Sequence, residues 1–310
     1  MPSGTHNILS LEETTMIQKP IFTGAATALI TPTTPDGVDY EAMGRLIDWQ
    51  IEKGIDALVI AGSTGEGKTL TIAEHREVLR YSAERIAGRV PMIAGTGSNE
   101  TSVSISMSKY ACEVGADGLL VVTPYYIKAT QNGLVKMYSM IADAVTKPVI
   151  IYNVPSRTGV NVEPETYARL ADHGNIAGIK EANGDISKIA TTAALVAGKL
   201  DIYSGNDDQI LPILSMGGKG VISVLSNLLP SETSRMCHLY FEGDTAGATA
   251  LQLKYIPLIR ALFIEVNPIP CKAAMAAMGW CENFLRLPLT PMEDAHKEKL
   301  FELMRAEGLI

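Results

Sequence analysis

One lysine of this sequence stands where its amine could act as a nucleophile. Lys180 lies within the apolar run "IAGIKEA" at residues 176–182. Burial in such a run disfavours the charged ammonium and lowers the pKa of the amine, which can then attack a carbonyl and form a Schiff base. The alternative is a lysine whose charged end reaches solvent or pairs with Glu181. The sequence indicates Schiff-base chemistry at Lys180 and leaves a structural role open.

Hydroxyl groups follow or end several other apolar runs, and they could move the protons that imine formation requires. These residues are Ser63, Thr64, Thr123, Tyr125, Tyr126, Tyr152 and Ser223. A single tyrosine is often a half-buried packing residue whose hydroxyl bonds to a convenient neighbour. Several hydroxyls gathered at one place around a lysine are more suggestive, and they favour a proton relay.

A glycine-rich segment, "GSTGEGKT" at residues 62–69, fits the nucleotide-binding pattern G-x-x-x-x-G-K-[ST]. A phosphate-binding loop begins its helix at the Lys-Ser/Thr pair, because the helix amino terminus holds the phosphates. Here Thr71 and Glu74 form a capping-box pattern that places the helix start near residue 71, which is too late. No other apolar run ends in an aspartate suited to magnesium. Nucleotides and phosphorylated ligands are therefore disfavoured.

Eight short apolar runs must position these groups. They occupy residues 25–30, 57–62, 91–96, 118–124, 148–153, 176–182, 201–206 and 220–224. Each is nearly continuously apolar, which is typical of parallel strands buried on both faces, and helical stretches alternate with them. This order predicts an α/β fold, a (β/α)8 TIM barrel. A doubly wound sheet is less consistent with the chain, since "TPTTPDG" follows the first run where a dinucleotide fingerprint would stand.

The same pattern divides the chain into three parts. Residues 21–243 are predicted to form the catalytic barrel. Residues 244–310 carry only helical periodicity and are predicted to form a small helical domain. Residues 1–20 are polar and lack an apolar segment of signal-peptide length, so we expect a leader that is disordered or not native.

Composition excludes several classes of function. The net charge is −8 and no Lys/Arg-rich segment occurs, so a nucleic-acid partner is not expected. The four cysteines form no C-x-x-C pair and the five histidines are scattered, which favours reduced thiols in the cytoplasm and no metal site. No apolar stretch is long enough to cross a membrane.

Several motifs together resemble one family. In order along the chain these are "GSTGEG", "IAGTGSN", "VTPYY", "IIYNVPSRTG", "GIKEANGD", "YSGNDD", "GGKGVISV" and "NPIPCK". They resemble the dihydrodipicolinate synthase family of the pyruvate-dependent class I aldolases, and the resemblance covers residues 21–310. N-acetylneuraminate lyase belongs to the same superfamily.

The resemblance implies a cytoplasmic enzyme of lysine biosynthesis, a homotetramer built as a dimer of dimers. It would condense pyruvate with L-aspartate 4-semialdehyde without a metal or organic cofactor. Lys180 matches the Schiff-base lysine, and Tyr152 matches the general acid/base. Ser63 matches the relay hydroxyl, and Tyr126 matches a relay tyrosine contributed across a subunit interface.

The resemblance also implies substrate contacts. Thr64 and the backbone of Ile222 match pyruvate contacts, and Gly205 matches a backbone position near the lysine. Arg157 matches the residue that selects the semialdehyde, because its guanidinium suits a carboxylate. Ser63 stands where threonine is usual in the synthases, and neuraminate lyases also carry serine there. A lyase or aldolase acting on a sugar acid therefore remains the alternative.

A second departure from the family concerns feedback inhibition by lysine. At three positions of the allosteric site of lysine-inhibited relatives, this chain carries Lys68, Ile72 and Val103. A cation has been added and an anionic partner lost, and both changes oppose the binding of cationic lysine. We predict weak or absent feedback.

Overall fold

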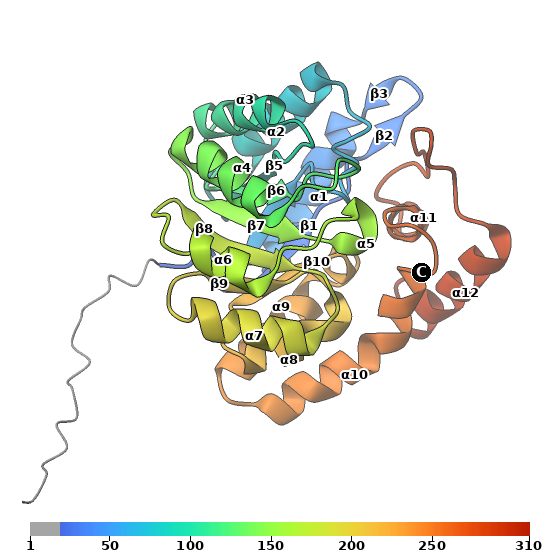
Figure 1. Ribbon diagram of the computed structural model, residues 1–310. Coiled ribbons are helices and arrows are strands. Elements are labelled where there is room, and N and C mark those ends of the chain that lie inside the picture. Colours follow the sequence, from blue (N-terminus) through green and yellow to red (C-terminus); the bar gives the residue numbers. More distant parts are fainter. Residues whose placement is uncertain (1–18) are drawn as a thin grey trace, which may run out of the picture.

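The computed structural model describes residues 19–310, which form a closed barrel of parallel strands surrounded by helices (Figure 1). The barrel strands are β1 Gly24–Ala28, β4 Ala57–Ile60, β5 Met92–Gly95, β6 Gly118–Val122, β7 Val149–Asn153, β8 Ile176–Glu181, β9 Asp201–Ser204 and β10 Gly220–Ser223. Each strand pairs with its neighbours along the chain, and β1 closes the ring by pairing with β10. All eight coincide with the apolar runs, so the predicted TIM barrel is confirmed.

Helices alternate with these strands and cover the outside of the barrel (Figure 1). They are α1 Tyr40–Glu52, α2 Ile72–Ile86, α3 Thr101–Glu113, α4 Gln131–Asp143, α6 Pro164–Leu170, α7 Ile186–Val196, α8 Ile210–Ser215 and α9 Pro230–Phe241. Shorter turns are α5 Pro155–Thr158, η1 Asp207–Gln209 and η2 Leu225–Asn227. Helix α2 begins as predicted: Thr71 is its N-cap and forms a capping box with Glu74.

A short hairpin after the first barrel strand was not predicted. A hairpin of two-residue strands, β2 Thr33–Thr34 and β3 Gly37–Val38, follows β1 within "TPTTPDG". Strands this short carry no periodic pattern, so the segment resembled a loop. The turn places Gly37 at φ +138°, a conformation that side chains rarely adopt.

The barrel interior is filled by a compact cluster of buried residues. Its members are Phe22, Ala26, Ala28, Ala57, Val59, Ile93, Leu120, Ile150, Tyr152, Val154, Tyr203 and Ile222. Along single strands they recur at every second position, as expected where alternate side chains face inward. A larger cluster packs the other strand faces against the helices.

After α9 the chain is helical, with α10 Thr245–Ala261, α11 Ile269–Ala277 and α12 Asp294–Ala306 (Figure 1). The predicted C-terminal helical region is confirmed, whereas its division from the barrel at residue 243 stays a prediction. The predicted leader lies outside the described residues except for Lys19 and Pro20, which have no regular secondary structure.

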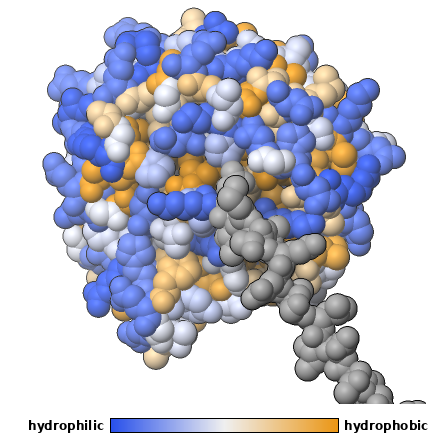
Figure 2. Space-filling view, turned by 90° about the vertical axis from the view of Figure 1, so that its left-hand side faces the viewer, coloured by the Kyte–Doolittle hydropathy of each residue, from blue (hydrophilic) through white to orange (hydrophobic). Residues whose placement is uncertain are grey.

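The surface carries a mixture of residue types. Figure 2 shows one face of the molecule as mainly hydrophilic, with separate apolar patches between the polar residues. In the part of the chain that the structure describes, no helix is both long and apolar enough to cross a membrane.

Candidate active site

Lys180 faces the interior of the barrel from β8. Strand register pairs it with Tyr152 on β7 and with Tyr203 on β9, both members of the interior cluster. The residue is 5% exposed, and its Nζ lies 4.4 Å from the centroid of the Tyr152 ring. Burial lowers the pKa of the amine to about 7, although the charge of Asp207 opposes this effect. A substantial fraction of the amine is therefore neutral at neutral pH.

The next residue on the strand, Glu181, does not pair with Lys180. Its carboxylate accepts hydrogen bonds from Asn153 Nδ2 at 2.9 Å, from the Tyr167 hydroxyl at 3.0 Å and from the Asn183 N–H at 2.9 Å. Burial raises the pKa of Glu181 to about 7. These contacts exclude the ion pair with Glu181 that was the alternative for Lys180, and they tie β8 to β7 one residue beyond the Tyr152–Lys180 pair.

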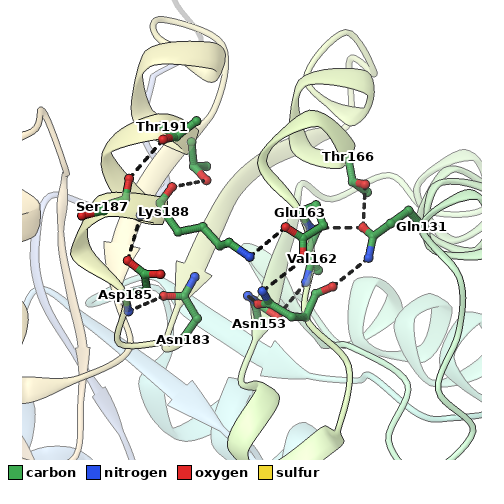
Figure 3. Close-up of polar contacts among 12 residues, drawn as sticks. Gln131, Asn153, Val162, Glu163, Thr166, Asn183, Asp185, Ser187, Lys188 and Thr191 are labelled. Carbon is green, nitrogen blue, oxygen red and sulfur yellow. Dashed lines mark hydrogen bonds and ion pairs between the residues drawn. The ribbon is translucent and has the colours of Figure 1, made fainter.

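The contacts around Asn153 extend outward through neighbouring helices. Figure 3 shows Lys188 of α7 reaching Glu163, with 2.8 Å between Nζ and Oε2. Gln131 of α4 accepts from the Glu163 N–H and from the Thr166 hydroxyl of α6. This polar network fixes the carboxyl ends of the two strands that carry Tyr152 and Lys180.

A cavity of about 410 Å³ opens at the carboxyl ends of the strands. Its lining includes Ser63, Glu66, Lys68, Gly97, Tyr125, Tyr152, Arg157, Thr158 and Asn267. Lys180 lies one side chain away, in contact with the ring of Tyr152. Burial raises the pKa of the Tyr152 hydroxyl, while the charge of Arg157 and the nearby Ser63 hydroxyl oppose the rise. The amine therefore lies against the ring of Tyr152, and Tyr152 and Ser63 both line the cavity.

Arg157 and Thr64 are joined through a residue that the sequence did not single out. Arg157, on α5, donates from Nη2 to the backbone oxygen of Asn267 at 2.8 Å. Asn267 Nδ2 in turn donates to Thr64 Oγ1 at 2.9 Å. Asn267 belongs to the quoted motif "NPIPCK", which was the available signal, but its partner Thr64 is 203 residues distant along the chain.

Tyr126 is placed away from the cavity of its own chain. It is 90% exposed, adopts a positive φ of 74°, and donates its N–H to Thr158 O. Its neighbour Tyr125 lines the cavity instead. Within a single chain the structure therefore does not bring Tyr126 together with Tyr152 and Ser63.

Gly205 follows the strand that pairs with that of Lys180, and Ile222 lies on the strand next to β1. Ile222 on β10 is fully buried in the interior cluster. Gly205 follows β9 and donates its N–H to Glu181 O at 2.7 Å, and a Cβ there would lie 2.8 Å from that of Ala182. Only a glycine fits this approach between the ends of β8 and β9.

Asp207 is a second residue that sequence reasoning missed. It is 2% exposed, and its Oδ2 accepts from the N–H groups of Val224 and Leu225 at 3.0 and 2.9 Å. Burial raises the pKa of Asp207, and the charge of Lys180 opposes the rise. Asp207 is thus a buried acid that acts electrostatically on the candidate nucleophile.

The glycine-rich segment at residues 62–69 lacks the geometry of a phosphate loop. Helix α2 starts only at Ile72, and the Lys68 ammonium donates to the backbone oxygen of Gly97. Within residues 19–310 there is also no group of three or more His, Cys, Asp or Glu that could hold a metal ion. The chemistry available at the cavity is that of an amine, hydroxyls and a guanidinium.

A closed parallel barrel with a buried lysine amine beside a tyrosine defines an enzyme of the class I aldolase type. A model of the dihydrodipicolinate synthetase family matches residues 21–307. The chain belongs to this family.

Individual relatives and solved structures support the same family assignment. The chain is 52% identical over 290 residues to 4-hydroxy-tetrahydrodipicolinate synthase from Clostridium perfringens (strain 13 / Type A), covering 94% of this chain and 100% of the relative. A monomeric dihydrodipicolinate synthase variant superposes with a TM-score of 0.92 at 42% identity, over 94% of this chain and 98% of the other. The enzyme from Acinetobacter baumannii, solved in complex with pyruvate, gives 0.91 at 40% identity, over 93% and 99%.

Proposed function

We propose that this protein condenses pyruvate with L-aspartate 4-semialdehyde, the reaction of 4-hydroxy-tetrahydrodipicolinate synthase in diaminopimelate and lysine biosynthesis. The observation that carries the proposal is the Lys180 amine, buried in the barrel with a pKa of about 7 and its Nζ 4.4 Å from the Tyr152 ring. The family to which the chain belongs supplies the substrates.

The reaction begins when neutral Lys180 attacks the pyruvate ketone. The resulting carbinolamine loses water to give an imine, and loss of a methyl proton gives an enamine. The enamine carbon attacks the aldehyde, whose oxygen takes up a proton. The amino group of the semialdehyde portion then attacks the imine carbon, which closes the ring and releases Lys180. Each of these steps moves a proton.

Tyr152 is the group that moves these protons, with Ser63 as the next hydroxyl of the relay. Tyr152 is 7% exposed, and it lines the cavity together with Ser63, so the two hydroxyls can pass a proton between them. Thr64, Gly205 and the backbone of Ile222 hold pyruvate near the amine. Arg157 lines the cavity and binds the carboxylate of the semialdehyde.

The active enzyme is a homotetramer in which a second copy of the chain completes the relay. The support is the position of Tyr126, which is 90% exposed beside Ile127 at 60%, with Ile72 at 61%. Exposed apolar residues of this size are typical of a surface that another chain covers. Tyr126 then enters the cavity of that second copy. The enzyme acts in the cytoplasm without a cofactor.

One observation favours the alternative substrate. Ser63 is the serine that neuraminate lyases also carry, so a sugar-acid lyase or aldolase must be tested directly. Two measurements decide. Borohydride reduction in the presence of pyruvate should give one covalent adduct, which mass spectrometry locates at Lys180. Coupled assays should show turnover of pyruvate with aspartate semialdehyde and none with N-acetylmannosamine. No adduct, an adduct at another residue, or the reverse preference would overturn the proposal.

A further inference from the structure

A buried ion pair connects the glycine-rich segment with the C-terminal helices, and its Glu66 also lines the cavity. Glu66 lies in the loop after β4 and Lys272 in α11, and the Lys272 Nζ is 2.5 Å from Glu66 Oε1. The side chains are 1% and 0% exposed. Lys272 also donates to the Thr33 hydroxyl at 2.7 Å. In Figure 1, α11 lies on the side of the molecule where the β2–β3 hairpin and α5 are found.

Burying this ion pair carries a large desolvation cost. Both charges have lost their water, and Glu66 Oε2 has no hydrogen-bond partner among the described residues. Glu66 also adopts φ +52°, a left-handed conformation that is uncommon for a residue with a side chain. Apolar side chains of similar volume often stabilise such a site equally well or better. Stability alone therefore does not account for a charged pair here.

The backbone around Glu66 is closely coupled to Ser63. The Glu66 N–H donates to Ser63 O at 3.2 Å, and the Gly67 N–H donates to Gly62 O at 3.1 Å. A Cβ on Gly67 would lie 2.1 Å from Ala61 O, so the loop is folded tightly on itself. A displacement of Glu66 therefore acts directly on Ser63, which lines the cavity together with Tyr152.

The segment that leads into α11 also contacts Thr64, the residue after Ser63. Asn267, two residues before the helix, donates to Thr64 Oγ1 at 2.9 Å. The C-terminal region thus contacts the loop at Thr64 and at Glu66, and Arg286 also donates to the backbone oxygen of Thr69 at 3.3 Å. Together they set the loop against the barrel end where Tyr152 and Lys180 lie.

We propose that Glu66 and Lys272 are a positioning pair, through which α11 fixes Ser63 and Thr64 relative to Tyr152 and Lys180. Neither residue takes part in the chemistry. The directional, short contact between two charges admits one loop geometry, whereas an apolar contact would admit several. The catalytic consequence rests on the proposed function, but the placement of the loop does not.

The test compares the single variants Glu66→Met and Lys272→Met with the double variant that carries both. Each single change leaves one buried charge unpaired, and we expect a melting temperature lower by about 5 to 8 °C. The double change removes both charges and should restore the melting temperature to within about 3 °C of the native protein. The matched control is Lys254→Met, which removes the partly exposed ion pair with Glu307 in the same region.

The double variant then separates positioning from stability. Hydrogen exchange of amides in residues 62–69 should be about 10-fold faster than in the native protein, with the barrel strands unchanged. Its kcat should fall about 100-fold, because a displacement near 1 Å has that effect on reacting groups. Prolonged borohydride reduction with pyruvate should still modify Lys180 completely. The control should match the native protein in all of these measurements.

Two results would overturn the proposal. A double variant with native loop exchange would show that the pair does not set the loop, whatever the reaction is. A double variant with native kcat would show that it only stabilises. If the native protein fails to turn over its substrates, the proposed function falls, and the exchange measurement alone still decides the positioning role.

Discussion

Replacing Lys180 with methionine should make the protein more stable, and the gain should depend on pH. In the folded protein burial lowers the pKa of Lys180 from 10.5 to about 7. Between these values the unfolded chain binds a proton that the folded chain does not, so the native free energy of unfolding rises with pH across this window. Below pH 7 the buried amine is protonated, and the free energy of unfolding is lowered by the full cost of burying this charge. Each pKa unit corresponds to ~1.4 kcal/mol, so a difference of about 3.5 lowers the free energy of unfolding by roughly 5 kcal/mol.

The variant Lys180→Met carries no proton at this position and escapes that cost. The difference in unfolding free energy between variant and native protein should be largest at pH 6 and should shrink by about 1.4 kcal/mol for each pH unit above 7. Urea unfolding at pH 6, 7, 8 and 9, followed by fluorescence, measures it. The same series on Lys254→Met, which alters a partly exposed lysine, should give a constant difference. A constant difference for Lys180→Met would refute the argument, since the amine would then titrate near its ordinary pKa and would not be a neutral nucleophile.

Three further predictions concern the other site residues. Arg157→Ala should raise the KM for aspartate semialdehyde about 10- to 100-fold and leave the borohydride adduct with pyruvate unchanged, because only the second substrate loses a charge-assisted hydrogen bond; an equal effect on both substrates would contradict this. Tyr126→Phe should lower kcat about 100-fold, and mixed oligomers of Tyr126→Phe with Lys180→Ala should recover activity that neither variant has; no recovery would place Tyr126 outside the neighbouring site. Added lysine at millimolar concentration should inhibit steady-state turnover by less than about two-fold, because Lys68 repels a second cation; strong inhibition would show that the site is intact.

The sequence predicts the barrel well because its signals are local. Each parallel strand is a nearly continuous apolar run. The capping box of Thr71 and Glu74, a motif of four residues, marks the start of α2 at Ile72. The position of Lys180 in such a run also predicts its burial and the direction of its pKa shift, since both depend on the strand that carries it.

The rest of the site depends on contacts between distant segments, which no local pattern records. Asn267 reaches Thr64 across 203 residues, and Lys272 reaches Glu66 across 206. The orientation of Tyr126 depends on a positive φ that nothing in "VTPYY" predicts, since no glycine stands there. Motifs can indicate which residues belong to the site, whereas the tertiary structure determines which of them are in contact.

The contacts of residues 267–272 also have a consequence for synthesis of the chain. All eight barrel strands precede residue 244, so the whole barrel is synthesised before the C-terminal helices. Asn267 and Lys272 reach the loop after β4 only later. A chain that stops before residue 267 would therefore contain all the barrel strands but would lack the contacts that set the loop after β4.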